Sequence, residues 1–306
     1  MEFIDKDYIG NTLFKRKEDA HKGDFGKVLI YAGSVGMAGA AILCGKAALR
    51  TGVGLARYLI TEERKEILPI LQVAVPEATC MIINNFQEID FSEYKAIICG
   101  CGLGKSSEVA AGLSVILDNF ENVLVLDADA LNVIASSPSL IEKTRNSLAE
   151  IIITPHVGEA KRLLNTCEGI SGLTGRKNSV CALAEKFDCI AVLKGSGTLI
   201  AKKRMGSEED SALGTDNTGD GGFSIYENTT GNPGMATGGS GDVLSGIIAS
   251  LAAQGYSALD SARMGVFLHG RAGDLVTKTV GEMSLTASDL LTLIPAAILE
   301  CYKEEL

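Results

Sequence analysis

The chain lacks the features that mark several classes of protein. Its eight cysteines include no CxxC pair and no cysteine–histidine cluster with the spacing of metal ligands. Its 28 basic residues are outnumbered by 38 acidic ones, and no basic stripe is present to displace the counterions of a nucleic acid. No apolar run reaches the length of a membrane span, and the first residues have neither the basic nor the apolar region of a signal peptide. We therefore expect a cytoplasmic protein with no nucleic-acid or membrane partner.

What the chain does contain is typical of a globular α/β protein. A hydrophobic fraction of 46% and a charged fraction of 22% are ordinary, and 306 residues leave room for a sizeable core. The 35 glycines exceed the usual share and cluster in loops, which suggests that backbone approaches a ligand there. Most cysteines lie in apolar runs and are expected to be small core residues of a reducing compartment.

Short apolar runs alternate with helical patterns along the chain. Strands are predicted at 27–32, 52–60, 96–99, 122–127, 151–154 and 189–194, with a hairpin at 198–201 and 223–226. Helices are predicted at 37–50, 62–68, 106–120, 130–135, 157–165, 174–187, 241–254, 257–278 and 286–299. This alternation predicts a mostly parallel sheet covered by helices on both faces.

No linker or internal repeat divides the sequence, so we expect one domain over residues 1–306. The polar residues 1–20 are expected to be a leader on the surface. The acidic, glycine-rich segment 204–222 has no apolar period and is expected to be a flexible insertion at the tip of the hairpin, more simply a passive one than a lid.

The stretch 231–251, GNPGMATGGSGDVLSGIIASL, is a glycine-dense loop that runs into an apolar helix. The start of a helix carries unpaired N–H groups and attracts anions, and glycines allow the backbone to close around a phosphate. Asp242, a carboxylate at this position, is out of place beside an anion unless it takes part in the chemistry. The alternative is that Asp242 only interacts favourably with the helix dipole, which would stabilise the helix by about 0.3–1 kcal/mol.

Two other glycine loops follow predicted strands. The loop of residues 33–40 has the spacing GxxGxxG rather than that of a Rossmann loop, and close packing or a ligand wall explains it equally well. The segment Gly102-Leu103-Gly104-Lys105-Ser106 ends like a P-loop, but the first glycine of that motif would fall at Cys99. A ligand-lining loop at a strand end is the preferred interpretation, because open α/β sheets bind ligands there.

Polar residues also follow several predicted strands. Asp127 and Asp129 are as consistent with a helix cap as with a metal or substrate site. His156 and Glu159 stand one helical turn apart past a strand end and can face one ligand, the alternative being a surface imidazole and a capping carboxylate. His21 and His269 have no comparable setting.

The segment Lys194-Gly195-Ser196-Gly197-Thr198 joins two predicted strands. On its own it is no more than a hairpin turn. Beside a phosphate, Lys194 would supply the positive charge that an acidic protein needs locally, and the hydroxyl of Thr198 could donate a hydrogen bond.

Together and in this order, these motifs resemble the ADP/ATP-dependent NAD(P)H-hydrate dehydratase family, which has a ribokinase-like fold. The matching pieces span roughly residues 20 to 300 and are Gly33-Ser34 with Gly39-Ala40-Ala41, Gly102-Leu103-Gly104, 126–132 (LDADALN), Thr154-Pro155-His156 with Glu159, 194–198 and 231–244. Six ordered motifs are far more specific than any one of them, and the last is the most diagnostic.

The resemblance implies a repair enzyme that dehydrates the S epimer of hydrated NADH or NADPH with ADP or ATP. Asp242 would be the catalytic base on the substrate hydroxyl, which attacks the terminal phosphate of the nucleotide. It also implies these roles: nucleotide binding by Lys194, Gly195, Ser196, Gly197, Thr198 and Gly241; substrate binding by Ala40, Gly102, Leu103, Gly104, His156 and Asp242; an anion hole at Gly239, Ser240 and Gly241; and secondary roles for Asn132 and Glu159. Mg²⁺ would assist, with no certain protein ligand.

The family further implies a homo-oligomer, a tetramer by analogy. No epimerase domain precedes residue 20, so the R epimer would need a separate NAD(P)H-hydrate epimerase as functional partner. Two other functions stay open. A kinase of the same fold, acting on a vitamin-precursor alcohol, would leave a stable phosphate ester, and a nucleotide sensor would not turn over at all.

Overall fold

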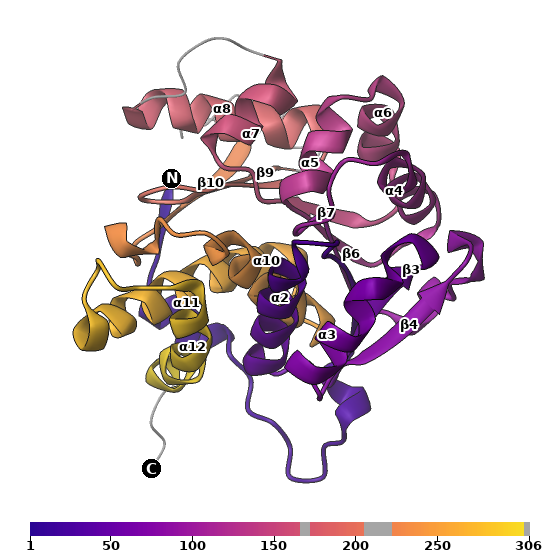
Figure 1. Cartoon of the computed structure of the whole chain (residues 1–306). Helices are drawn as coiled ribbons and strands as arrows, with labels where there is room; N and C mark the ends of the chain where they lie inside the picture. The colour runs from indigo at the N-terminus through magenta and orange to yellow at the C-terminus, as the bar shows by residue number, and fades with distance from the viewer. Residues whose placement is uncertain (166–171, 205–221, 303–306) are drawn as a thin grey trace.

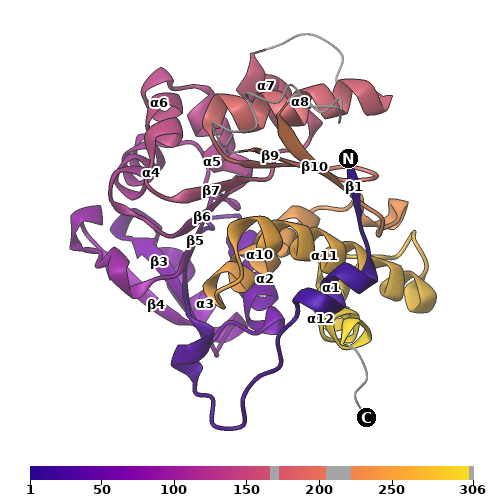
Figure 2. The same cartoon turned by 180° about the vertical axis from the view of Figure 1, so that it is seen from behind.

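A ten-stranded sheet runs through the molecule between two layers of helices (Figures 1 and 2). The structure is a computed structural model that describes residues 1–165, 172–204 and 222–302. The order across the sheet is β1-β10-β9-β8-β7-β6-β5-β2-β3-β4, and neighbours are parallel except for β8 with β9 and β9 with β10. The strands are β1 (Glu2–Ile4), β2 (Lys27–Tyr31), β3 (Leu55–Thr61), β4 (Thr79–Ile83), β5 (Ala96–Cys99), β6 (Val123–Leu126), β7 (Glu150–Ile153), β8 (Ile190–Leu193), β9 (Leu199–Lys203) and β10 (Phe223–Asn228).

Helices cover both faces of the sheet (Figure 1). One layer holds α1 (Lys6–Thr12), α2 (Ala38–Thr51), α3 (Leu68–Ala74), α10 (Ser240–Ala253), α11 (Ala258–Val280) and α12 (Ala287–Cys301). The other holds α4 (Ser107–Asn119), α5 (Ala128–Ala135), α6 (Pro138–Asn146), α7 (Val157–Leu164) and α8 (Gly172–Phe187). Short 3-10 helices are η1 (Lys22–Phe25), η2 (Glu62–Ile67), η3 (Phe86–Glu88), η4 (Phe91–Glu93) and η5 (Pro233–Met235). None of the helices in the described part of the chain has both the length and the apolar character needed to cross a membrane.

The strands in the middle of the sheet are buried on both faces. Ile98 and Val125 belong to the hydrophobic cluster on the α2–α10 side, whereas their neighbours Ile97 and Leu124 belong to the cluster on the α4–α8 side. Successive side chains of a strand point to opposite faces, so a strand that is covered twice needs apolar residues throughout. This is why these strands appear in the sequence as continuous apolar runs.

The predicted mostly parallel sheet with helices on both faces is confirmed. The predicted strands and helices are all present, with the segment 62–68 a 3-10 helix that leads into α3. The predicted hairpin is confirmed as the antiparallel pair β9 and β10, and it is closed by a hydrogen bond from Arg204 N to Gly222 O. The expected flexible insertion between them lies outside the described residues, and the assignment of residues 1–306 to a single domain stays a prediction.

The elements that were not predicted include β1, α1, α3, β4 and α6, and the short 3-10 helices η1, η3, η4 and η5. The expectation of a surface leader at residues 1–20 is wrong for its first half. β1 adds a parallel strand to the edge of the sheet beside β10, and the side chains of Ile4 and Ile9 are fully buried. A three-residue strand carries too little periodicity to be recognised, and its partner lies more than 200 residues away.

The integration of β1 can be tested with two neighbouring residues on opposite sides of the strand. Ile4→Ala should lower the free energy of unfolding by about 2–5 kcal/mol, because it leaves a cavity beneath the edge of the sheet. Phe3→Ala is the matched control, since Phe3 is 63% exposed, and it should stay within about 0.5 kcal/mol of the unmodified chain. Urea unfolding measures both. Equal effects of the two substitutions would show that β1 does not contribute to the core.

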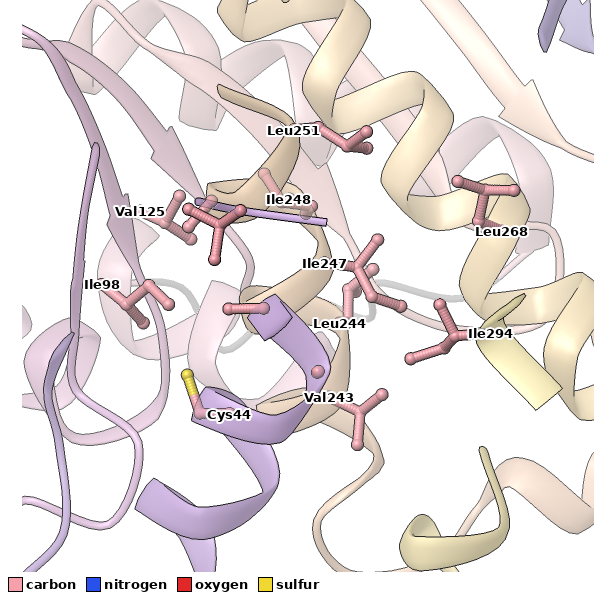
Figure 3. Close-up of a cluster of buried hydrophobic side chains, with 14 of the residues drawn as sticks. Cys44, Ile98, Val125, Val243, Leu244, Ile247, Ile248, Leu251, Leu268 and Ile294 are labelled. Carbon is pink, nitrogen blue, oxygen red and sulfur yellow. The ribbon is translucent and has the colours of Figure 1, made fainter. Parts of the chain in front are cut away.

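Helix α10 forms the centre of one layer. Its residues 243–253 are all buried, and they are apolar except for Gly246 and the two serines Ser245 and Ser250. Figure 3 shows Val243, Ile247 and Leu251 among side chains that come from the sheet, α2, α11 and α12. A Cβ at Gly246 would lie 2.3 Å from the carbonyl oxygen of Cys44, so the close approach of α10 to α2 requires a glycine. This packing holds the start of α10 in place.

Candidate active site

The candidate residues lie where the parallel strands end. The carboxyl ends of β2, β5, β6, β7 and β8 meet at one edge of the sheet, because the strands are parallel and adjacent. The two glycine loops leave β2 and β5, Asp127 follows β6, His156 follows β7, and Lys194 follows β8. Helix α10 begins at the same edge.

The start of α10 has the backbone geometry of a tight anion site. Its N-cap, Gly239, has φ +88°, and a Cβ there would lie 2.4 Å from Cδ1 of Leu43, so both conformation and space demand glycine. Ser240 N donates to Thr237 O at 3.4 Å, and Val243 N donates to Gly239 O. The N–H groups of Gly241 and Asp242 lie in the first turn, where no acceptor within the helix is available. These N–H groups are suited to an anion, and the anion hole predicted at 239–241 stays a prediction.

Lys194 and Asp127 form a buried ion pair beneath this turn. Lys194 Nζ lies 2.7 Å from Asp127 Oδ1, and the Asp127 side chain is only 1% exposed. Ser245 Oγ of α10 donates to the other oxygen, Oδ2, at 2.7 Å. A Cβ on Gly241 would lie 3.0 Å from Lys194 Nζ, so the ammonium group is close to the backbone of the first turn. Burial alone would lower the pKa of Lys194, but the carboxylates of Asp127 and Glu159 raise it, and the lysine stays charged.

Asp242 has a pKa well above that of an ordinary aspartate. Burial, and after it the nearby Asp127 carboxylate, raise the pKa of Asp242 to about 6. The neighbouring Cys101 and the ammonium group of Lys194 oppose this rise by favouring the ionised form. Interaction with Cys44 and burial raise the pKa of Cys101 well above its usual value, so its thiol stays protonated. A carboxylate with a pKa near neutrality can accept a proton and release it again.

The two upstream glycine loops are joined to each other. Gly33 N donates to Cys101 O, and Ser34 Oγ donates to Gly102 O, both at 2.8 Å. A Cβ on Gly102 would lie 2.8 Å from Cβ of Ala40. The structure thus brings together Ala40 and the loop of Gly102 and Gly104, which were predicted to bind one ligand. Leu103 as a whole is only 1% exposed, its N–H donates to Gly100 O and its carbonyl accepts from Arg64, so this residue supports the loop from beneath.

The structure gives other roles to Cys99, where a P-loop would need its first glycine, and to Ser106, which ends the P-loop-like segment. Cys99 is the last residue of β5, and Ser106 is the N-cap of α4, its hydroxyl accepting from Val109 N. Asp129 accepts a hydrogen bond from Gly104 N at 2.8 Å, which ties the loop to α5. These contacts support the preferred interpretation of a loop at a strand end.

His156 and Glu159 form a capping box at the start of α7. His156 Nδ1 accepts hydrogen bonds from the N–H groups of Gly158 and Glu159, and Glu159 Oε2 accepts from His156 N. Glu159 is thus the capping carboxylate of the alternative interpretation, whereas the capping role of His156 was not predicted. The His156 side chain remains 55% exposed, which leaves its ring accessible to a substrate. Burial raises the pKa of Glu159. Asn132, on α5, accepts from Arg162 Nε at 2.9 Å.

The turn after Lys194 is held mostly by its own atoms. Thr198 Oγ1 donates to Gly195 O at 2.9 Å and accepts weakly from Gly195 N. The hydroxyl that was expected to reach a phosphate is therefore used within the turn. Gly195 and Ser196 are exposed, so they form the face of this loop that a ligand can approach.

His269 was given no role from the sequence, yet it lies beneath the anion site. Its Nε2 is 3.2 Å from Ser240 Oγ. Burial lowers the pKa of His269 to about 4, so the ring is neutral at pH 7. Its position on α11, 29 residues past Ser240, offers no local signal. Ser245 was missed because it meets Asp127 only through the packing of α10 on the sheet. Cys101 was missed although it stands next to Gly102 in a predicted ligand loop, since a buried cysteine was expected to be no more than a core residue.

The site offers no protein cage for a metal ion. Among residues 1–165, 172–204 and 222–302, no group of three or more histidine, cysteine, aspartate or glutamate side chains is placed to hold one. Mg²⁺ that arrives with a nucleotide needs only one or two carboxylates besides the phosphates and water. Asp129 lies at this edge and uses one carboxylate oxygen on Gly104 N, so the site fits a metal carried by the nucleotide.

Comparison with known proteins agrees with this geometry. The sequence profile of the NAD(P)H-hydrate dehydratase family matches residues 28–296. The chain is 38% identical over 281 residues to a bifunctional NAD(P)H-hydrate repair enzyme of Coxiella burnetii, covering 91% of this chain and 51% of that protein. It is 35% identical over 275 residues to the ADP-dependent (S)-NAD(P)H-hydrate dehydratase of Neisseria meningitidis, covering 88% of this chain and 83% of that one.

The fold agrees as well. The structure of the ADP/ATP-dependent NAD(P)H-hydrate dehydratase from Bacillus subtilis, co-crystallized with ATP and Mg²⁺, superposes with a TM-score of 0.79 at 28% identity, covering 98% of both chains. The chain spans about half the length of the bifunctional relatives it matches. The match over nearly the whole chain shows that this protein belongs to the NAD(P)H-hydrate dehydratase family and has its ribokinase-like fold.

Proposed function

We propose that this protein dehydrates the S epimer of hydrated NADH or NADPH, using ADP or ATP as co-substrate. The observation that carries the proposal is Asp242, an acid with a pKa of about 6 at the start of α10, beside the ammonium group of Lys194. A base and an anion site are thus combined at one helix terminus. The names of the Neisseria and Bacillus relatives support the same reaction.

The chemistry divides into two steps. Asp242 accepts the proton of the substrate hydroxyl while the hydroxyl oxygen attacks the terminal phosphorus of the nucleotide, and AMP leaves from ADP, or ADP from ATP. The phosphate then departs from the substrate with the electron pair of its C–O bond, and the neighbouring ring atom loses a proton, which restores the dihydropyridine. The enzyme's part is mostly positioning and charge stabilisation.

The remaining residues are assigned to the two ligands. Lys194 and the backbone of residues 195–198, with Gly241, would hold the nucleotide. Ala40, residues 102–104 and His156 would line the hydrated dinucleotide, so that Asp242 stands between the ligands. The N–H groups of Gly241 and Asp242 would stabilise the transferring phosphate, where loss of one such donor typically costs about 2.7–4 kcal/mol. Mg²⁺, when bound, would neutralise charge on the phosphates.

The test is direct. Purified protein, hydrated NADH or NADPH, Mg²⁺ and either ADP or ATP are mixed, and the recovery of dihydropyridine absorbance and the release of phosphate are followed. We expect both signals to rise in equal amounts. A stable phosphate ester without recovered absorbance would replace this proposal by a kinase, and binding of nucleotide with no turnover on either substrate would replace it by a sensor.

The reaction should depend on pH through Asp242. The base must be ionised to accept a proton, so kcat/KM should be level above about pH 6 and fall roughly tenfold per unit below it, since kcat/KM reports the groups of the free enzyme. Initial rates between pH 5 and 8 measure this, with stability checked at each pH. A profile that is flat across that range would remove Asp242 from the role of base.

We further propose that the protein is cytoplasmic, that it assembles as a homo-oligomer, a tetramer by analogy, and that an NAD(P)H-hydrate epimerase is its functional partner. The partner is supported by the relatives that are named bifunctional repair enzymes, of which this chain matches about half. Light scattering on the purified protein tests the assembly.

A further inference from the structure

Arg64, in η2, contacts both glycine loops on the proposed dinucleotide side. Its Nη1 donates to Gly33 O at 2.9 Å and to Leu103 O at 2.7 Å. Its Nε lies 3.1 Å from an oxygen of Glu108, on α4. The arginine is 6% exposed, so it is buried behind the loops and does not reach the ligand itself.

These contacts make Arg64 the link between two loops that leave different strands. The loop of Gly33 follows β2 and the loop of Leu103 follows β5, and Ala40 lies in the first turn of α2, the helix that the first loop leads into. A guanidinium group is planar and presents several donors in a fixed arrangement, which a lysine ammonium cannot reproduce. Glu108 fixes the plane of the group from the opposite side. The relative position of the two loops therefore depends on Arg64.

Arg176, in α8, binds backbone carbonyl groups of the proposed nucleotide loop, as Arg64 does for the two glycine loops. Its Nη1 donates to Ser196 O, and its Nη2 donates to Gly197 O at 2.9 Å. A Cβ on Gly195 would lie 3.3 Å from Nη2. Arg176 thus binds the carbonyl groups of residues 196 and 197 and adds to the hydrogen bonds that the turn between β8 and β9 makes within itself.

We propose that Arg64 and Arg176 are positioning residues that serve different ligands, Arg64 by holding the two loops of the hydrated dinucleotide and Arg176 by holding the nucleotide loop. The assignment of loops to ligands rests on the proposed function. The division of labour follows from the contacts, because neither arginine donates to a loop of the other ligand in the described part of the chain.

The experiment compares Arg64→Lys and Arg176→Lys, which keep the charge and lose the planar fork. KM is measured for the hydrate at saturating ADP, and for ADP at saturating hydrate. Arg64→Lys should raise KM for the hydrate roughly tenfold to a hundredfold and leave KM for ADP nearly unchanged, and Arg176→Lys should do the reverse. Arg57→Lys is the control and should change neither value. Arg57 lies near the other end of β3, and its contacts are with Thr79, Tyr94 and Glu93 rather than with either ligand's loops.

A purely structural role would lower the melting temperature and the amount of active protein without separating the two KM values. Equal shifts of both values in either variant, or a shift in melting temperature alone, would overturn the proposal. Should Arg64→Lys fail to fold, Arg64→Met/Glu108→Gln removes both charges of the buried pair and is expected to show the same rise in KM for the hydrate.

Direct binding separates this inference from the proposed reaction. Calorimetric titration with ADP and with NADPH, the product, needs no turnover. If the unmodified protein binds both but does not dehydrate the hydrate, the proposed function fails. The positioning roles then stand only if Arg64→Lys weakens NADPH binding alone and Arg176→Lys weakens ADP binding alone.

Discussion

Asp242→Asn is expected to lower kcat by about 10²–10⁴-fold, the usual contribution of a positioned general base. Asparagine has nearly the same size but cannot accept the hydroxyl proton. ADP affinity should be retained, because the N–H groups of the first turn and Lys194 are unchanged. Phosphate release measures turnover, and calorimetry measures the affinity. Asp289→Asn is the matched control, since Asp289 also lies in the first turn of a helix, α12, but in an exposed capping box.

The same substitution should stabilise the protein above pH 6. The pKa of Asp242 is raised from 3.8 to about 6 in the folded state, so the folded protein binds this proton more tightly than the unfolded chain does. Ionised Asp242 therefore costs stability, and the cost is fully present above about pH 6 and absent below about pH 4. At about 1.36 kcal/mol per unit it amounts to roughly 2–3 kcal/mol. Asp242→Asn should unfold at a higher urea concentration than the unmodified protein at pH 8, with the difference shrinking toward pH 4.

These two results together distinguish a base from a structural acid. Lost turnover in a more stable protein that still binds ADP is the expected outcome. Turnover equal to that of the unmodified protein would sink the assignment of Asp242 as the base. Loss of ADP binding or of stability at pH 8 would show instead that Asp242 supports the loop.

The second large effect concerns the ion pair beneath the site. Lys194→Met should lower the free energy of unfolding by about 3–5 kcal/mol, because it leaves the Asp127 carboxylate buried without its counter-charge. Ser245 Oγ and Ala128 N still donate to that carboxylate, which places the effect toward the lower end of this range. Turnover should fall as well, since the nucleotide loses a nearby cation. Urea unfolding at pH 7 and phosphate release measure the two effects.

A double variant separates the two consequences. Lys194→Met/Asp127→Asn removes both charges and should return stability to within about 1 kcal/mol of the unmodified protein, whereas turnover should stay low. The exposed pair of Lys202 with Glu150 provides the control, and Lys202→Met should cost less than about 1 kcal/mol. If Lys194→Met costs no more than Lys202→Met, the pair at Asp127 does not have the energetics of a buried one.

Whether a strand could be predicted from the sequence depends on how many of its faces are covered by other elements. β5, β6 and β7 were predicted because they are buried on both faces and must be apolar at every position. β1 and β4 were not predicted, because each forms an edge of the sheet, where a strand can be short or partly exposed. No local pattern in the sequence shows where β1 pairs, because its partner β10 is more than 200 residues away and lies beside it only in the folded sheet.

The site shows the same division. Asp242 and the glycines before it were identified from consecutive residues, since a helix start with its loop is a local structure. The pair of Lys194 with Asp127 joins residues that are 67 positions apart in the sequence. It forms because β8 and β6 are separated in the sheet only by β7, and because α10 packs across their ends. Arg64 and His269 contact the loops of the site from η2 and α11, whose own sequences contain no sign of it.

By itself, the sequence determined the alternation of strands and helices, the glycine loops and the acid at the start of α10, because burial on both faces and backbone conformation each leave a mark on neighbouring residues. Only the tertiary structure decided the electrostatic environment of that acid. Its pKa of about 6 arises from burial and from Asp127, and the charge beside it comes from Lys194, which another strand supplies. Electrostatic interactions act across space rather than along the chain, so they are set by the order of strands in the sheet and the packing of α10 upon it.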